Sequence, residues 1–129
     1  ALFSCEKEPS SEDKAKETAG LFAKYYYTWR LADAISLTDE NMELRIRFLS
    51  SNVHKADIEV LHGATETPEI EVDDITMEDD SNAIATVLLD NVYMMDTLGT
   101  KVHLYKDVKK KLKLKLKDAG WRVVSIEEN

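Results

Sequence analysis

The sequence has little of the residues on which many recognisable functional sites depend. Its 129 residues include one cysteine, two prolines, four glycines and three histidines. A single cysteine excludes an internal disulfide, and glycines that never cluster exclude the common loops that bind phosphate groups. The histidines, His54, His62 and His103, do not have the spacing of metal ligands on a helix. We therefore expect neither a metal nor another cofactor.

Long hydrophobic runs and a positive net charge are also missing. No apolar segment approaches the roughly 18 residues that a membrane-spanning helix requires. The formal net charge is −8, which describes a surface that repels phosphate backbones, so we expect no nucleic-acid partner. A content of 43% hydrophobic and 33% charged residues is typical of a globular protein. The length fits a single domain, which we place at residues 12–129.

The densest run of one charge, Lys109–Lys117, reads KKKLKLKLK and predicts a β-strand. Residues two apart share a face of a strand but not of a helix, so Leu112, Leu114 and Leu116 would face a core and the lysines water. Residues 118–120 then predict a tight turn into a final strand at 121–126. Val108 and Lys110 have the parity of the leucines, which makes the start of the apolar row less regular.

Acidic residues are concentrated between Thr65 and Asn91, where there is no lysine or arginine. Strands of opposite charge in one sheet can pair across their outer faces. The lysine row is interpreted as a solvated outer face, and contact with an acidic partner is the alternative.

The N-terminal half predicts helices. Ser10 can cap a helix that an apolar, aromatic face continues to about Ser36. Thr38 predicts the cap of a second helix, which should end near Asn52. Residues 54–69 fit either a short strand or a third helix.

From Ile70 the apolar spacing becomes that of strands. The alternation changes phase at residues 73–74, as a β-bulge or a shift of register would produce. The run from Ala83 to Tyr93 is apolar at nearly every position through its centre, which predicts a central strand covered on both faces. Residues 100–117 are long for one strand and should bend near residue 106. Helices followed by at least four strands predict an α+β fold with an antiparallel sheet.

The single cysteine, Cys5, ends the tetrapeptide LFSC, which resembles the lipobox of bacterial lipoproteins. In that family the signal peptide is removed before the cysteine, which then carries the lipid. Residues 6–13, EKEPSSED, suit a short tether, so residues 1–11 are interpreted as a lipobox remnant and tether. Lipidation of Cys5 would place the protein in the cell envelope, periplasmic or surface-exposed, with a membrane as partner. The alternative is an incidental terminal thiol.

Three stretches carry a wider resemblance: FAKYYYTWRL, DDITMEDDSNAIATVLL and LKLKLKDAGWRVVSIEE. Through them the chain resembles the nuclear transport factor two-like superfamily, and more narrowly small bacterial envelope lipoproteins of unknown function that carry this domain. The resemblance covers about residues 12–128. It implies a strongly curved, cone-shaped antiparallel sheet, of the cystatin-like kind, wrapped round a long helix and open at one end. It also implies association as a homodimer, but it does not choose a function, because this fold carries enzymes, ligand binders and protein-binding scaffolds.

Aromatic residues are the remaining candidates for a binding site. The residues expected to line the pocket are Tyr25, Tyr26, Trp29, Asp33, Tyr93 and Trp121. For most of these rings the favoured interpretation is packing in the core. The alternative is a pocket lined by tyrosine hydroxyls, which suits a small apolar ligand with one or two polar groups. Met94 and Met95 could lie at the pocket mouth.

Three functions remain open from the sequence. The favoured one is a lipid-anchored envelope protein whose pocket binds a small molecule or peptide without catalysis. The second is an envelope enzyme that uses Asp33 or Asp90 with a tyrosine for acid–base chemistry. The third is an interaction or immunity module that uses the outer face of the sheet.

Overall fold

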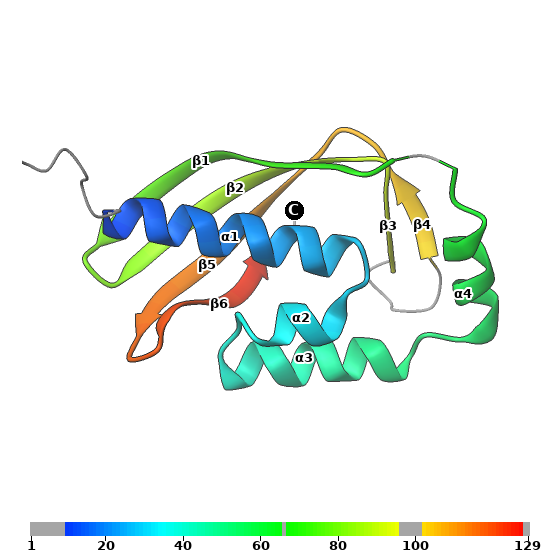
Figure 1. Ribbon diagram of the computed structural model, residues 1–129, viewed down its shortest axis with the longest axis horizontal. Helices are drawn as coiled ribbons and strands as arrows, with labels where there is room; N and C mark the ends of the chain where they lie inside the picture. The colour runs from blue at the N-terminus through cyan, green and yellow to red at the C-terminus, as the bar shows by residue number, and fades with distance from the viewer. Residues whose placement is uncertain (1–9, 66, 96–101, 128–129) are drawn as a thin grey trace, which may run out of the picture.

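A computed structural model of the chain describes residues 10–65, 67–95 and 102–127 (Figure 1). Helices packed against a mostly antiparallel sheet make the fold α+β, as predicted. The elements, in chain order, are α1 (Ser11–Tyr27), α2 (Leu31–Ile35), α3 (Glu40–Ser51), α4 (Lys55–His62), β1 (Glu69–Asp79), β2 (Asn82–Asp90), β3 (Val92–Met95), β4 (Val102–Tyr105), β5 (Val108–Lys117) and β6 (Gly120–Glu127).

Four strands form the main sheet in the order β1-β2-β5-β6, and β3 and β4 form a separate two-stranded ribbon. All these pairings are antiparallel. Helix α1 lies lengthwise across the main sheet, with α2 and α3 beside its C-terminal half (Figure 1). The ribbon and α4 lie at the end of the molecule opposite the start of α1 (Figure 1).

The lysine-rich segment is strand β5, and a tight turn joins it to β6, as its alternation predicts. Leu112 and Leu114 are fully buried against the helices. Leu116 is 41% exposed because it lies next to the hairpin turn, where it pairs with Trp121. The leucines therefore face the core, except at the tip of the hairpin.

The acidic and lysine-rich strands do not pair with each other, contrary to the pairing considered from the sequence. Strand β2 lies between them, so Asp74 of β1 is opposite Thr86, and Thr86 is opposite Lys111 of β5. No ion pair joins Lys111, Lys113 or Lys115 to another residue of the described segments. The outer face of the sheet thus carries a row of acidic side chains on β1 and a row of lysines on β5. The outward-facing side chains of β2 lie between these two rows.

Of the remaining strand predictions, some are confirmed and one is wrong. The register of β1 shifts between Val72 and Asp74, which confirms the predicted irregularity at residues 73–74. Strand β2 is central, as predicted, but the prediction that both its faces are covered is wrong. Its burial alternates, because only the face toward α1 is covered by a helix; Ile84 and Leu88 on the other face are half-buried. Asp107, with a φ of 50°, provides the bend before β5.

The first helix begins as predicted. The Ser10 hydroxyl accepts the Asp13 N–H at 3.1 Å, and the Asp13 carboxylate accepts the Ser10 N–H at 3.3 Å. This reciprocal pair satisfies donors that the first turn of a helix would otherwise leave unpaired.

The prediction that this helix continues to Ser36 is wrong, because α1 ends at Tyr27. The Arg30 N–H donates to the Tyr25 carbonyl at 2.8 Å, and the Trp29 N–H donates to the Tyr26 carbonyl at 3.2 Å. This is the bonding of a Schellman motif, in which glycine usually takes the left-handed position. Trp29 takes it here, with a φ of 66°. The chain then resumes as the short helix α2.

Main-chain hydrogen bonds attach the segment between α2 and α3 to β6. The Val123 N–H donates to the Leu37 carbonyl at 2.8 Å, and the Asp39 N–H donates to the Val123 carbonyl at 3.2 Å. Thr38 is used in this bridge, and Asp39, one residue later than predicted, caps α3 by accepting the Met42 N–H at 2.8 Å. The sequence left open whether residues 54–69 form a strand or a helix. They contain the helix α4.

None of the helices in the described segments combines the length and apolar composition needed to cross a membrane.

Candidate functional site

A cavity of about 490 Å³ lies between the C-terminal end of α1, the inner side of α3 and the far end of the sheet. Helix α1 contributes Tyr26 and Tyr27 to its wall, and α3 contributes Met42, Ile46 and Leu49. The cavity has the size of a site for a small organic molecule.

The strands form the opposite wall. Leu89, the last residue but one of β2, lines the cavity, and so do Met94 and Met95 of β3, at the strand end where the sequence suggested a pocket mouth. The chain can turn from β2 into β3 because Asn91 adopts a φ of 58°, a left-handed conformation that asparagine tolerates. This turn directs β3 out of the main sheet and so leaves the cavity between the ribbon and α3.

The aromatic wall is held by ring packing. Phe22 stacks on Tyr26 with ring centroids 5.3 Å apart, and Tyr26 meets Tyr27 edge to face at 4.9 Å. Phe22 is fully buried, so it supports the two tyrosines from the core side. Such ring pairs hold a preferred geometry in addition to burying apolar surface.

The polar groups in the cavity wall have an uneven charge. Among the described residues that line it, Arg45 and Lys110 carry positive charge and none is acidic. The hydroxyl groups of three tyrosines and the amide of Asn52 are the other side-chain polar groups of this wall. Lys110 faces the cavity because it has the parity of Leu112, which places it on the inner side of β5.

Two large side chains of α3 lie at the rim of the cavity and are open to water. Phe48 is 70% exposed and Leu44 is 66% exposed, and both line the cavity. They are one helical turn apart, so they form one continuous apolar edge. An exposed apolar edge beside a cavity is typical of a binding site.

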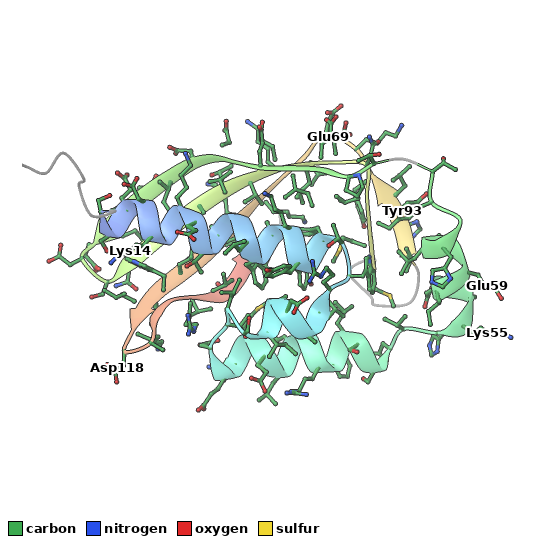
Figure 2. The ribbon with its side chains drawn as sticks, viewed as in Figure 1. Lys14, Lys55, Glu59, Glu69, Tyr93 and Asp118 are labelled. Carbon is green, nitrogen blue, oxygen red and sulfur yellow. The ribbon has the colours of Figure 1, made fainter. Side chains whose placement is uncertain are left out.

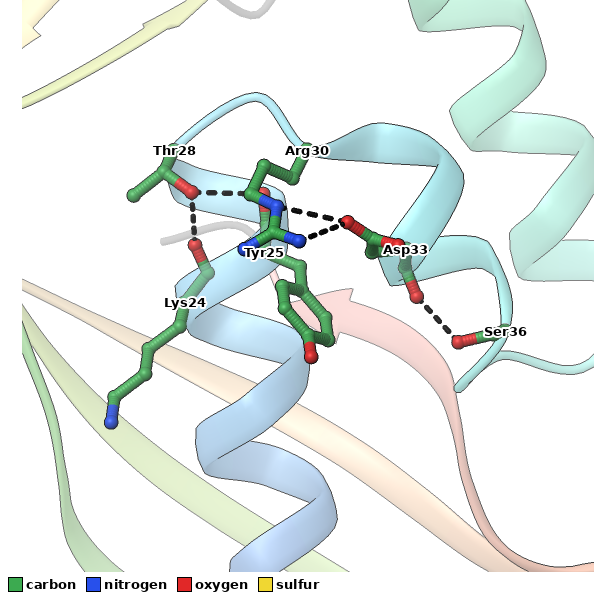
Figure 3. Close-up of polar contacts among 6 residues, drawn as sticks. All are labelled: Lys24, Tyr25, Thr28, Arg30, Asp33 and Ser36. Atoms are coloured by element: carbon green, nitrogen blue, oxygen red, sulfur yellow. Dashed lines mark hydrogen bonds and ion pairs between the residues drawn. The ribbon is translucent and has the colours of Figure 1, made fainter.

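Of the six residues predicted to bind a ligand, the structure brings Tyr26 to this cavity. Tyr25 does not line it; the guanidinium carbon of Arg30 lies over the Tyr25 ring, 4.9 Å from the ring centroid (Figure 3). Asp33 forms an ion pair with Arg30 at 2.7 Å and is about half exposed (Figure 3). Both residues therefore belong to a surface cluster at the helix break.

Trp29 and Tyr93 are joined by a hydrogen bond from the Trp29 side chain to the Tyr93 main chain. The Trp29 indole N–H donates to the Tyr93 main-chain carbonyl at 2.6 Å, which fixes the helix break to β3. Figure 2 shows Tyr93 on the β3–β4 ribbon, at the opposite end of the molecule from Asp118 in the β5–β6 turn. Trp121 also lies at that other end, where its indole N–H donates to the Ser11 hydroxyl at 3.3 Å.

The second candidate carboxylate has a structural role. Asp90 accepts the Asp107 N–H at 3.1 Å and so supports the bend before β5. It does not line the cavity. No group of three or more histidine, cysteine, aspartate or glutamate side chains is placed to hold a metal in residues 10–65, 67–95 and 102–127. Cys5 lies outside the described residues.

Sequence reasoning missed most of the cavity wall. The sequence pointed to Tyr26 but not to the adjacent Tyr27. It predicted the helix that became α3 but did not assign that helix to a pocket. The signal for Lys110 was present in the sequence, because a lysine interrupts an otherwise apolar row. No periodicity could have shown that Met42 and Leu89 face the same space, since that depends on the bridge between Leu37 and Val123.

No protein-family model and no curated protein matches the chain. Among solved structures, the crystal structure of the intermembrane space region of the chloroplast protein ARC6 is similar, with a TM-score of 0.41 and 14% sequence identity. The match covers 87% of this chain and 94% of that chain. A similarity at this level carries no conclusion about function.

Proposed function

We propose that the protein is a non-catalytic binding module that holds a small apolar molecule in the cavity between α1, α3 and the far end of the sheet. The cavity itself carries this proposal. It has the volume of a ligand site, an apolar lining and an exposed apolar rim. Figure 1 shows the long helix lying on the antiparallel sheet. That layout supports, as part of the proposal, the cone of the nuclear transport factor two-like superfamily.

The first test uses Nile red, a neutral apolar dye whose fluorescence rises on transfer from water. We expect saturable binding by the unaltered chain and at least tenfold weaker binding by Leu49→Trp, which places a large ring in the cavity. Val60→Trp on α4 is the matched control, because Val60 is exposed and outside the cavity. Equal dye binding by the unaltered protein and Leu49→Trp would contradict the proposed site.

The second part of the proposal is a lipid anchor on Cys5 that holds the module in the cell envelope. The lipobox-like tetrapeptide and the polar residues after it support this part. Mass spectrometry of the protein extracted from host membranes should show a diacylglyceryl or triacyl addition on Cys5, absent from Cys5→Ser. An unmodified thiol on membrane-extracted protein would remove the anchor and leave the cavity proposal intact.

A second candidate function is supported by the outer face of the sheet. Lys111 and Lys115 are exposed there beside the half-buried Ile84 and Leu88 of β2, which suits an acidic protein partner. Binding of a polyglutamate peptide, measured by fluorescence anisotropy, should weaken with added salt and in Lys111→Glu. Salt-independent binding would count against this face.

An acid–base enzyme has less support. Asp33 and Asp90 both lie outside the cavity, and each has a local structural partner.

A further inference from the structure

We infer that the ligand of the cavity is a neutral, flat molecule with fused aromatic rings, which the aromatic side chains of α1, α3 and β4 hold by ring contacts. The inference rests on the proposed function and names the chemical class of the ligand.

The first observation is which side chains of the cavity wall are open to a ligand. Part of the wall is fully buried core, but Tyr26 and Tyr105 are half-buried and Phe48 is 70% exposed. These three rings come from three different elements, α1, β4 and α3. A molecule in the cavity can therefore contact an aromatic surface from each of these elements.

The second observation concerns the ring of Phe48. No ring contact joins Phe48 to another aromatic residue of the described segments. Its place at the end of α3 is supported by the Asn52 side-chain amide, which donates to the Phe48 carbonyl at 3.0 Å. A phenylalanine ring with most of its surface in water gains free energy when another apolar surface covers it. A flat ligand at the rim would provide that surface.

The third observation is that the tyrosine wall is already formed. Tyr26 is stacked on the buried Phe22 and meets Tyr27 edge to face. Rings that are held by their neighbours lose little freedom when a ligand packs on them, so less of the binding free energy is spent on ordering the site. Stacked and edge-to-face contacts are also those that an aromatic ligand would continue.

The fourth observation is that methionine is concentrated at the same place. Three of the four methionines of the chain, Met42, Met94 and Met95, line the cavity. A thioether sulfur makes favourable contacts with aromatic rings, often at the ring edge. Methionine and aromatic side chains in one wall therefore favour an aromatic ligand over a saturated one of similar size.

The charge of the lining favours a neutral ligand. Aromatic side chains can also hold a quaternary ammonium group through cation–π interactions. The described lining, however, has no acidic side chain and includes Arg45, which disfavours a cation. The hydroxyl of Tyr105 supplies a group that can form a hydrogen bond with a hydroxyl or carbonyl of a neutral ligand.

The test compares three compounds with the same two-ring carbon skeleton and the substituent at the same ring carbon: naphthol, its saturated counterpart decalol, and naphthyltrimethylammonium. Each competes with Nile red. Decalol is at least as apolar as naphthol, so a site that selects by apolar area alone should bind it at least as tightly. We expect naphthol to bind about tenfold more tightly than decalol, and the ammonium compound to bind most weakly.

Substitutions that keep apolar volume but remove a ring test the contacts themselves. Phe48→Leu and Tyr105→Leu should each weaken naphthol about fivefold and leave decalol unchanged. Tyr25→Leu is the matched control, because it removes a ring of α1 that lies outside the cavity and beside Arg30. It should leave the binding of both compounds unchanged.

The outcomes separate the inference from the proposed function. Decalol binding as tightly as naphthol, tightest binding by the ammonium compound, or a loss of naphthol in Tyr25→Leu as large as in Phe48→Leu would overturn the inference. The cavity would then remain a site without preference for neutral aromatic molecules. Failure of Nile red and all three compounds to bind would overturn the proposed function as well.

Discussion

The two ends of the sheet are packed in different ways. At the start of α1, which we call the packed end, the residues between helix and sheet are small, and Ala15, Ala19, Ala83 and Ala85 are all fully buried. At the end of α1, which we call the open end, the corresponding residues are large, and Tyr26, Tyr27, Met94 and Met95 surround the cavity. The same helix therefore closes on the sheet at one end and stands off from it at the other.

This difference shows how one helix and one sheet can combine a core with a site. Alanines allow close approach of backbones and leave no space between them. At the other end, bulky rings hold the helix and the sheet apart. They fill only part of the space between helix and sheet, because β3 leaves the main sheet at Asn91. The packed end should therefore determine stability, and the open end should tolerate change.

The largest expected contrast is between two phenylalanines. Phe22 is fully buried and Phe48 is 70% exposed at the cavity rim. Phe22→Ala should lower the free energy of unfolding by about 3–5 kcal/mol, because it leaves a cavity in a packed core. Phe48→Ala should change it by less than about 1 kcal/mol. Urea denaturation of both variants measures the contrast, and equal losses would show that the buried ring contributes no more to stability than the exposed ring at the rim.

The next contrast comes from adding volume. Ala19→Leu should destabilise the protein by about 1–3 kcal/mol, because Ala19 is fully buried and the larger side chain would overpack the core. Leu49→Phe, which extends into the cavity, should cost less than about 1 kcal/mol because the added atoms enter existing space. Thermal unfolding of the two variants provides the comparison, and a tolerated Ala19→Leu would show that the alanine end is not tightly packed.

A smaller, stabilising effect is expected at Gly20. A Cβ added there would meet a Val72 methyl group at 3.5 Å, an ordinary van der Waals distance. Gly20→Ala should therefore gain about 0.5–1 kcal/mol from helix propensity alone. A loss of stability in urea denaturation would mean that α1 and β1 are closer than this geometry allows.

The smallest effect concerns the turn between β1 and β2. The Ser81 main-chain N–H, and then the Asn82 side chain, hold the pKa of Asp79 below its ordinary value. The stability that this depressed pKa contributes is present above the unfolded-state pKa and is lost as the pH falls through the folded-state pKa. Asn82→Ala should raise the pKa of Asp79 toward the ordinary value, as an NMR titration of its carboxyl carbon would show. An unchanged titration curve would exclude the Asn82 contribution.

The parts of the fold that the sequence predicts are those set by local pattern. The alternation in β5, the Ser10–Asp13 cap and the irregularity after Val72 each depend on neighbouring residues, and each is found. The break at Trp29 was missed because a tryptophan takes the position where glycine is usual, and its indole bond to Tyr93 comes from 64 residues away. The half-exposed face of β2 was missed because apolar residues on both faces do not show which face a helix covers.

The candidate site was less predictable than the fold for the same reason. Tyr26 was identified from the aromatic helix, but Trp121 is also aromatic and lies at the packed end. Aromatic residues in a sequence indicate large side chains. They do not show whether other side chains of the core fill the space beside each ring or leave a cavity there. Lys110 was the better indicator, since a charge in an apolar row marks a departure from simple packing.

The hydrogen bonds of Leu37 and Asp39 with Val123 are made by main-chain atoms alone. Substitutions of these three residues by other non-proline residues would leave the donors and acceptors in place. The anchorage of α3 is thus decoupled from the side chains that α3 presents to the cavity. Related chains that share this junction could exchange Met42, Arg45 or Leu49 and acquire a different ligand preference while the helix keeps its position.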